Sequence, residues 1–445
     1  MTGKRKRKLA MPDTLIIVAS VVLLVAILSW IIPSGTYDYQ EMNINGRIRN
    51  VAIDGTYHTI DKSEVTTTGF LGFFSVLYRG CVEAADVIFM ILCCCGTFGV
   101  VVKTGAFHAG IGTILKKLKG KEILLVPIIM MIFGLGGSVF GMASEFYGFY
   151  PLIVGLGVAL GYDAMFGFAI IAVGEFVGFM GATLNPYSVG IAQTISGVEL
   201  YSGTGYRAIC FVIFMAISII YVMVYGRKIK KNPGASVVFG EKNIHAFDRD
   251  ELNEYSFTLK DGLVLLDVLV VLVVLMLGLI KWGWDFPQLC GLFLLMSMIA
   301  AAICKWSPNK WCSEFIDSAK TAMWGCILTG IAKAITVVMQ DAQIMDTVIY
   351  GLSNVLKNAP HAVSAQVMLV VQTLINFFIP SATGQASATM PIMAQLADII
   401  GVSRQTAVLA FQFGDGLSNI FWPTADIVII CGLGGISLQK WYKWF

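Results

Sequence analysis

The chain has 445 residues, of which 57% are hydrophobic and 13% charged, and its net charge is +3. The charged share is about half of that in soluble domains. The charges fall between long apolar runs, because a lone charge at the centre of a bilayer costs several kcal/mol. This composition excludes a soluble multidomain protein and predicts an all-α polytopic membrane protein.

The N-terminal part has the charged head of a signal peptide but not its other features. A basic run at residues 4–8 precedes an apolar run at 14–32 that is long enough to span a bilayer, and no small-residue cleavage site follows it. We therefore expect a retained first helix. Residues 33–68 are rich in Thr, Asn, Asp and Gly and predict an extracytoplasmic loop that forms a short hairpin.

Further apolar runs have the length of about 20 residues that a spanning helix needs. We expect such helices at residues 84–102, 164–180, 207–225, 262–280, 287–304, 322–339 and 405–413 with its continuation to 430. The amphipathic stretches 107–118 and 344–356 are typical of helices at the membrane interface, with a polar loop as the alternative.

Two apolar regions, 123–160 and 362–400, are too long for one helix, and each is broken midway by small residues. The breaks lie at 134–145 and 380–387. If both regions are re-entrant hairpins that do not cross, the later basic clusters fall on the same side as the run at 4–8, as the positive-inside rule requires. We therefore predict a bacterial inner-membrane protein with a cytoplasmic N-terminus.

The two halves of the chain resemble each other. A shift of 240 residues aligns Pro151 with Pro391 and Gly174 with Gly414, and an odd number of crossings between equivalent helices predicts inverted repeats. We expect no closing helix in the second repeat, and infer that a C-terminal helix is missing. The predicted parts are a first repeat 1–231 (hairpin 122–160, interrupted helix 164–197, closing helix 204–226), a cytoplasmic linker 232–260, and a second repeat 261–445 (hairpin 361–400, interrupted helix 402–433).

Polar residues interrupt the apolar helices at 141–145, 183–188, 381–387 and 414–424. Unpaired backbone is tolerated at membrane depth only inside protein or beside a water-filled cavity, so four such interruptions predict a binding site near the midplane. The alternative is that Gly and Pro only kink packed helices. The candidate binding residues are Ser144, Glu145, Glu175, Asn185, Ser188, Ser381, Thr383, Gln385, Ser387, Asp415, Asn419 and Thr424.

Acids outnumber bases in these interruptions. Glu145, Glu175, Asp415 and Asp426 lie in or beside them, with Lys333 as a possible partner. Pairing with a base or a position in an aqueous vestibule are the alternatives to a role in binding. The excess of acids favours a cationic or zwitterionic solute, or a coupling Na⁺ or H⁺.

Other function classes lack their residues. The cysteines form no CxxC pair, the four histidines are scattered, and no metal, nucleotide or nucleophile motif occurs. We expect no enzyme, no metal site, no cofactor and no nucleic-acid partner. A passive channel would need a continuous polar lining, whereas the polar residues cluster at the breaks.

Four stretches, 185–193 (NPYSVGIAQ), 389–398 (TMPIMAQLAD), 401–407 (GVSRQTA) and 410–416 (AFQFGDG), resemble the YfcC family, grouped with the DcuC-type carriers of the ion-transporter superfamily. The resemblance implies a homodimer with a scaffold and a transport domain that moves like an elevator, with the site at the hairpin tips and interrupted helices. It also implies arginine/ornithine-type exchange or carriage of four-carbon dicarboxylates.

The dicarboxylate carriers of the superfamily have a Ser-Asn-Thr signature at the tips, where this chain has ASE at 143–145 and ATG at 382–384. We therefore expect an antiporter for basic amino acids. The alternative is a C4-dicarboxylate carrier, with or without cation coupling.

Overall fold

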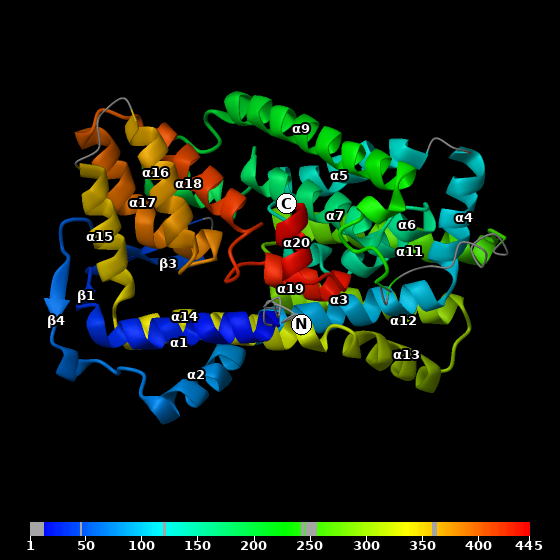
Figure 1. Cartoon of the computed structure of the whole chain (residues 1–445), viewed down its shortest axis with the longest axis horizontal. Coiled ribbons are helices and arrows are strands. Elements are labelled where there is room, and N and C mark those ends of the chain that lie inside the picture. Colours follow the sequence, from blue (N-terminus) through cyan, green and yellow to red (C-terminus); the bar gives the residue numbers. More distant parts are fainter. Residues whose placement is uncertain (1–12, 45–46, 119–121, 242–244, 246–255, 358–362) are drawn as a thin grey trace, which may run out of the picture.

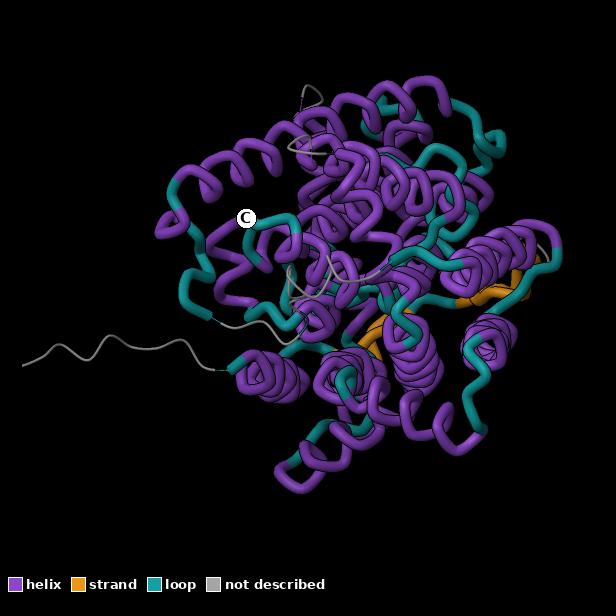
Figure 2. Tube along the Cα trace, turned by 90° about the vertical axis from the view of Figure 1, so that its right-hand side faces the viewer, coloured by secondary structure: helices purple, strands orange, loops and turns teal. Residues whose placement is uncertain are grey.

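The computed structural model describes residues 13–44, 47–118, 122–241, 245, 256–357 and 363–445. The basic run at 4–8 and the start of the second hairpin at 361–362 lie outside the described residues. Helices make up most of the molecule, and the strand segments are small beside them (Figures 1 and 2).

The helices are α1 (Thr14–Ile31), α2 (Phe70–Glu83), α3 (Ala85–Lys103), α4 (Ala106–Leu118), α5 (Leu125–Leu135), α6 (Phe149–Ala159), α7 (Ala164–Met180), α8 (Val189–Ile195), α9 (Thr204–Lys231), α11 (Leu259–Lys281), α12 (Phe286–Ile303), α13 (Pro308–Lys320), α14 (Met323–Asp341), α15 (Met345–Lys357), α16 (Ser364–Asn376), α17 (Ala382–Ile399), α18 (Arg404–Ser418), α19 (Ile427–Gly434) and α20 (Leu438–Trp444). The strands are β1 (Ser34–Thr36), β2 (Tyr39–Ile44), β3 (Arg47–Ala52) and β4 (His58–Ile60).

Six helices of the described chain are long and apolar enough to cross a membrane: α1, α3, α9, α11, α12 and α14. They coincide with six of the runs predicted from the sequence. Polar caps mark where these apolar helices begin: Asp285 and Gln288 form a capping box at the start of α12, and Thr258 and Asp261 form one at the start of α11. The predicted retained first helix is α1, and the predicted interfacial stretches are α4 and α15.

The loop after α1 forms two antiparallel strand pairs, β1 with β4 and β2 with β3, as its composition predicts. Asp346, in the first turn of α15, holds this loop: it accepts hydrogen bonds from the backbone N–H of Tyr37 at 3.0 Å and from the hydroxyl of Tyr39 at 2.8 Å. Burial and the charge of Asp346 raise the pKa of Tyr39, so its hydroxyl remains a donor. The loop is thus fastened to the second half of the chain.

Both predicted hairpins are broken, but the second break is shorter than expected. In the first, α5 leads through a π-helix (Gly136–Phe140) and an irregular tip to α6. In the second, α16 ends at Asn376 and α17 already begins at Ala382. The prediction that 381–387 is unwound is therefore wrong, because Ser381 caps α17 by accepting from the N–H of Gly384.

Both predicted interrupted helices are interrupted: 181–188 separates α7 from α8, and 419–426 separates α18 from α19. The second interruption was predicted to begin at Gly414, and this is wrong. Gly414 and Gly416 remain in α18 because their lack of a side chain permits close packing: a Cβ on Gly416 would lie 2.4 Å from the Cα of Met180 in α7. These glycines are packing residues.

The sequence analysis did not predict α2 and α13. Both are short, and α13 mixes apolar and charged residues in the pattern of a surface helix. Each precedes one of the spanning helices α3 and α14.

The elements from α2 to α8 recur in the same order from α13 to α19. The start of α2 at Phe70 and that of α13 at Pro308 are 238 residues apart, and α7 and α18 start 240 residues apart, at Ala164 and Arg404. The recurrence in sequence is thus also a recurrence of structure.

The two recurring units exchange equivalent contacts. α1 and α2 pack against α14, while α12 and α13 pack against α3, its counterpart; likewise α8 packs against α17 and α19 against α6. In Figure 1 the group of α1, α2 and α14 and the group of α3, α12 and α13 lie end to end along the lower edge. Such reciprocal contacts are those of two copies related by a two-fold axis.

Candidate functional site

The four interruptions come together around two adjoining cavities. The acidic cavity, of about 500 Å³, is lined by both hairpin tips and both interrupted helices, among them Glu145, Tyr187, Thr383 and Asn419. The lysine cavity, of about 430 Å³, is lined by α2, α14, α17 and the second interruption. Both cavities share Val87, Pro380, Ser381 and Asp426. A third cavity of about 510 Å³ lies beside α9 and touches none of the interruptions.

The first hairpin tip is shaped by Gly141, whose φ of 69° is left-handed. A Cβ at this position would lie 2.3 Å from Oδ1 of Asn185, so only glycine fits. The next residues form a short 3₁₀ turn, in which the carboxylate of Glu145 accepts from the N–H of Ala143 at 3.0 Å. Ser144 and Glu145 thereby reach the wall of the acidic cavity.

Asn185 organises the first interruption. Its Oδ1 accepts from the N–H groups of Tyr187 at 2.9 Å and Ser188 at 3.2 Å, replacing the backbone acceptors that the helix has lost. Nδ2 of Asn185 and Oγ of Ser188 are buried and have no hydrogen-bond partner among the described residues. Neither side chain lines one of the two cavities.

Each hairpin tip bonds to the interruption of the other repeated unit. Thr383, in the first turn of α17, donates its hydroxyl to the carbonyl of Tyr187 at 2.8 Å. Tyr147, in the first tip, donates to Asp426 at 3.4 Å. The cavities therefore lie where the two units meet.

Asp415 and Gln385 lie in a buried network of amides. Asn376 donates to Oδ1 of Asp415 at 2.8 Å and to Oε1 of Gln385 at 3.1 Å, and Gln385 donates to Gln372. Asp415 and Gln385 are fully buried and line neither cavity, and Oδ2 of Asp415 has no partner among the described residues. Asn376 and Gln372 were not predicted, since nothing in the sequence pairs α16 with α18.

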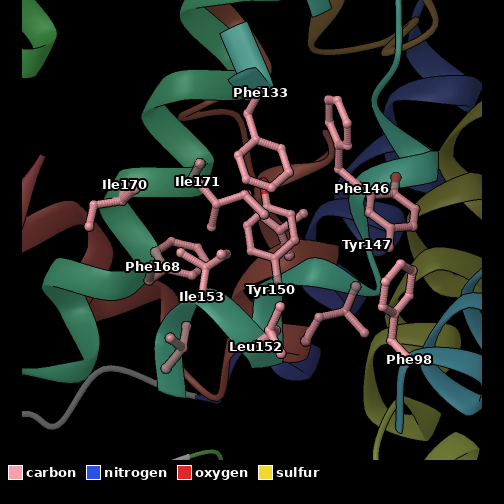
Figure 3. Close-up of a cluster of buried hydrophobic side chains, with 14 of the residues drawn as sticks. Phe98, Phe133, Phe146, Tyr147, Tyr150, Leu152, Ile153, Phe168, Ile170 and Ile171 are labelled. Atoms are coloured by element: carbon pink, nitrogen blue, oxygen red, sulfur yellow. The ribbon is translucent and has the colours of Figure 1, made fainter. Parts of the chain in front are cut away.

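Glu175, in the middle of α7, is also fully buried and lines neither cavity. Its Oε2 accepts from the hydroxyl of Tyr150 at 2.6 Å, while Oε1 has no partner among the described residues. Tyr150 belongs to an apolar cluster with Phe133, Phe146 and Phe168 (Figure 3). The acid therefore sits behind the first hairpin tip.

The predicted site residues thus fall into two groups. Those that line a cavity are Ser144, Glu145, Ser381, Thr383, Ser387, Asn419 and Thr424, whereas Glu175, Asn185, Ser188, Gln385 and Asp415 lie behind the walls.

Two acids of the cavity wall were missed in the sequence. Asp86 and Asp285 line the acidic cavity together with Glu145 and Asp426, and no basic side chain of the described chain lines it. They escaped notice because each lies at the end of a spanning helix, where charges are common. The described residues contain no cluster of His, Cys, Asp and Glu that could hold a metal ion.

Comparison with known proteins places this geometry in a family. Residues 11–445 match the DcuC family, described as C4-dicarboxylate anaerobic carriers. The chain is 33% identical to the Escherichia coli (strain K12) protein YfcC, whose name proposes a basic amino acid antiporter; the match covers 99% of this chain and 94% of that protein. It is 27% identical to an uncharacterised protein of Haemophilus influenzae, with the same coverage.

Two solved structures are similar at low identity. The YdaH transporter of Alcanivorax borkumensis has 14% identity and a TM-score of 0.42, over 97% of this chain and 95% of that one. MtrF of Neisseria gonorrhoeae, from a class of antimetabolite efflux pumps, has 16% identity and a TM-score of 0.41, over 98% and 95%. The family is one of carriers and the E. coli relative is named as an antiporter, so the chain is related to transporters and not to enzymes. The chain belongs to the DcuC family and is a YfcC-type membrane transporter.

Proposed function

We propose that the protein is a secondary active transporter that exchanges basic amino acids of the arginine/ornithine type across the bacterial inner membrane. The observation that supports this most directly is the acidic cavity, whose wall carries Asp86, Glu145, Asp285 and Asp426 and no basic side chain among the described residues. Carboxylates in a site of low dielectric attract cations strongly and repel dianions. The name of the E. coli relative agrees with this substrate class.

The proposed mechanism is alternating access by an elevator movement of inverted repeats. The reciprocal packing of α1 and α2 on α14, and of α12 and α13 on α3, supports a scaffold formed by the first helices of each unit. The hairpins and interrupted helices carry the cavity walls and form the moving part in this proposal. Inverted repeats account for both the inward-facing and the outward-facing state, since each repeated unit can adopt the conformation of the other. By its resemblance to the family, we propose a homodimer.

The second candidate is a C4-dicarboxylate carrier, which the description of the family favours. Lys333 and the N-terminus of α17 at the lysine cavity are the features of this chain that would attract a carboxylate. A coupling ion is a separate question. Oδ1 of Asn419 is buried without a partner among the described residues and would suit a Na⁺ ligand, but an exchanger of charged amino acids needs no coupling ion.

A ligand that binds only the folded protein raises its melting temperature, so a solute panel tests the proposal. We expect arginine and ornithine to stabilise the purified protein, and succinate and fumarate to have no effect. Stabilisation by the dicarboxylates alone would replace the proposed function with the second candidate. Counterflow of arginine in proteoliposomes should proceed in sodium-free buffer, and a strict sodium requirement would exclude plain exchange.

A further inference from the structure

Lys333 carries a positive charge within a helix that is otherwise suited to the bilayer. It lies near the middle of α14, one of the six helices that could cross a membrane. Among the described residues it has neither an ion pair nor a hydrogen bond. Because a charge at such depth is costly without a partner, one that the chain itself leaves unpaired indicates a partner from outside.

The surroundings of Lys333 are those of a small polar site. The lysine cavity also holds Asp426 and, near the end of α2, the exposed Glu83. Thr424 lines the same cavity, and its buried Oγ1 has no partner among the described residues. A volume of about 430 Å³ is in the range of small-molecule sites.

The start of α17 adds a second positive feature to this cavity. Ser381 caps this helix of 18 residues, and both Ser381 and Gly384 line the cavity. The unpaired N–H groups and the dipole at a helix N-terminus favour an anionic group nearby. Lys333 and α17 therefore favour a carboxylate in a cavity that also contains the carboxylate of Asp426.

These charges belong to one repeated unit only. At the spacing of 238 residues between α3 and α14, Lys333 corresponds to the buried Cys95. At the same spacing between α8 and α19, Asp426 corresponds to the buried Ser188. Packing of the repeated helices thus does not require either charge, which supports a role of both in binding a ligand.

We propose that Lys333 binds the carboxylate of a zwitterionic α-amino acid while Asp426 binds its α-ammonium group. The inference rests on the proposed function and specifies it. Asp426 lines both cavities, so an amino acid held at its α-carbon in the lysine cavity extends its cationic side chain into the acidic cavity, toward Glu145, Asp86 and Asp285. Lys333 is then the residue that distinguishes an amino acid from the corresponding amine.

The test compares arginine with agmatine, which is arginine without its carboxylate, and uses thermal stabilisation of the purified protein. The wild type should bind arginine more tightly than agmatine. Lys333→Gln should lose at least about tenfold in affinity for arginine and keep its affinity for agmatine, while Lys333→Arg should retain part of the preference. The matched control is Lys320→Gln: Lys320 is exposed and paired with Asp317 at 2.7 Å, outside both cavities, and both affinities should be unchanged.

Equal arginine affinity in Lys333→Gln and wild type would overturn the inference while leaving the proposed function intact. An equal loss for arginine and agmatine would also overturn it, since the lysine would then act on the fold. If the wild type binds succinate and no amino acid, the proposed function fails. In that case the inference fails with it, and a loss of succinate binding in Lys333→Gln would assign Lys333 to the second candidate function.

Discussion

Asp426 and Asp415 have different environments although both lie in the second interrupted helix. Asp426 lines both cavities and accepts a long hydrogen bond from Tyr147 at 3.4 Å, whereas Asp415 is fully buried and accepts from Asn376 at 2.8 Å. A direct role in binding therefore fits Asp426 better. Asp415, one of the four acids that the sequence indicated, contacts the amide network and not the cavities.

We predict that Asp426→Asn loses arginine binding and that Asp415→Asn loses much less. Removing one member of a desolvated charge pair costs about 2–5 kcal/mol. Asn at position 415 keeps an acceptor for Asn376 and turns the unpaired Oδ2 into a donor group, so the fold should be retained. Arginine titrations followed by thermal stabilisation measure both variants, with Glu175→Gln expected to have a small effect as well. A larger loss in Asp415→Asn than in Asp426→Asn would make Asp415 the direct ligand.

At this scale the sequence predicted which residue types occur near the interruptions and not which of them reach a cavity. Glu145, Asn419 and Thr424 line a cavity, whereas Glu175, Gln385 and Asp415 do not. The position of Gln385 depends on Asn376 and Gln372, which α16 supplies from another segment of the hairpin. Such pairings follow from how helices pack, which periodicity does not specify.

The first hairpin tip depends on a contact between two elements. Gly141 has a left-handed φ and touches Asn185, so Gly141→Ala should disturb both the tip and the first interruption. We expect a loss of about 1–3 kcal/mol in the free energy of unfolding, together with a strong loss of arginine exchange.

The matched control is Gly55→Ala. Gly55 has a φ of 78°, but nothing lies within 4 Å of the Cβ position, so the substitution has only the backbone cost. Melting temperature and proteoliposome exchange are measured for both variants. Equal effects of the two substitutions would mean that the contact with Asn185 does not matter.

The bond from Thr383 to the carbonyl of Tyr187 joins the second hairpin to the first interruption. Thr383→Val should reduce arginine exchange and lower the free energy of unfolding by no more than about 1.5 kcal/mol, the usual net value of one hydrogen bond. Thr373→Val is the control, because its hydroxyl bonds within α16 to Leu369. Arginine exchange at the wild-type rate in Thr383→Val would show that transport does not need this hydrogen bond between the second hairpin and the first interruption.

The sequence predicted the elements better than their limits. Runs of apolar residues predicted eight spanning helices, six of which are long and apolar enough to cross a membrane in the structure, and polar clusters predicted four interruptions near the places where the chain breaks. The limits of the interruptions within the second hairpin and the second interrupted helix were wrong for one reason: glycine and serine were treated as helix breakers there. In the structure Ser381 caps a helix, and Gly414 and Gly416 allow close helix packing.

The whole molecule combines two units whose reciprocal contacts are those of a two-fold axis. The weak self-similarity of the sequence predicted the units, yet the exchange of contacts between α2 and α14 and between α13 and α3 depends on helices that the sequence analysis missed. An axis in the membrane plane gives inverted repeats, whereas an axis along the membrane normal gives parallel ones. The two arrangements differ in where the hairpin tips open.

In inverted repeats the two tips open toward opposite sides of the membrane, the first toward the cytoplasm and the second toward the outside. We therefore predict that a membrane-impermeant thiol reagent labels Ser144→Cys in inside-out vesicles, whose cytoplasmic face is exposed to the reagent. The same reagent should label Thr383→Cys in right-side-out vesicles.

Both side chains line the acidic cavity, so the reagent must reach the same space from two directions. The background needs Cys312 replaced, since it is the one exposed cysteine among the described residues. Excess arginine should slow the labelling at both positions, because the solute occupies that space. Labelling of both cysteines from one side only, with and without arginine, would contradict inverted repeats and leave a parallel arrangement of the two units.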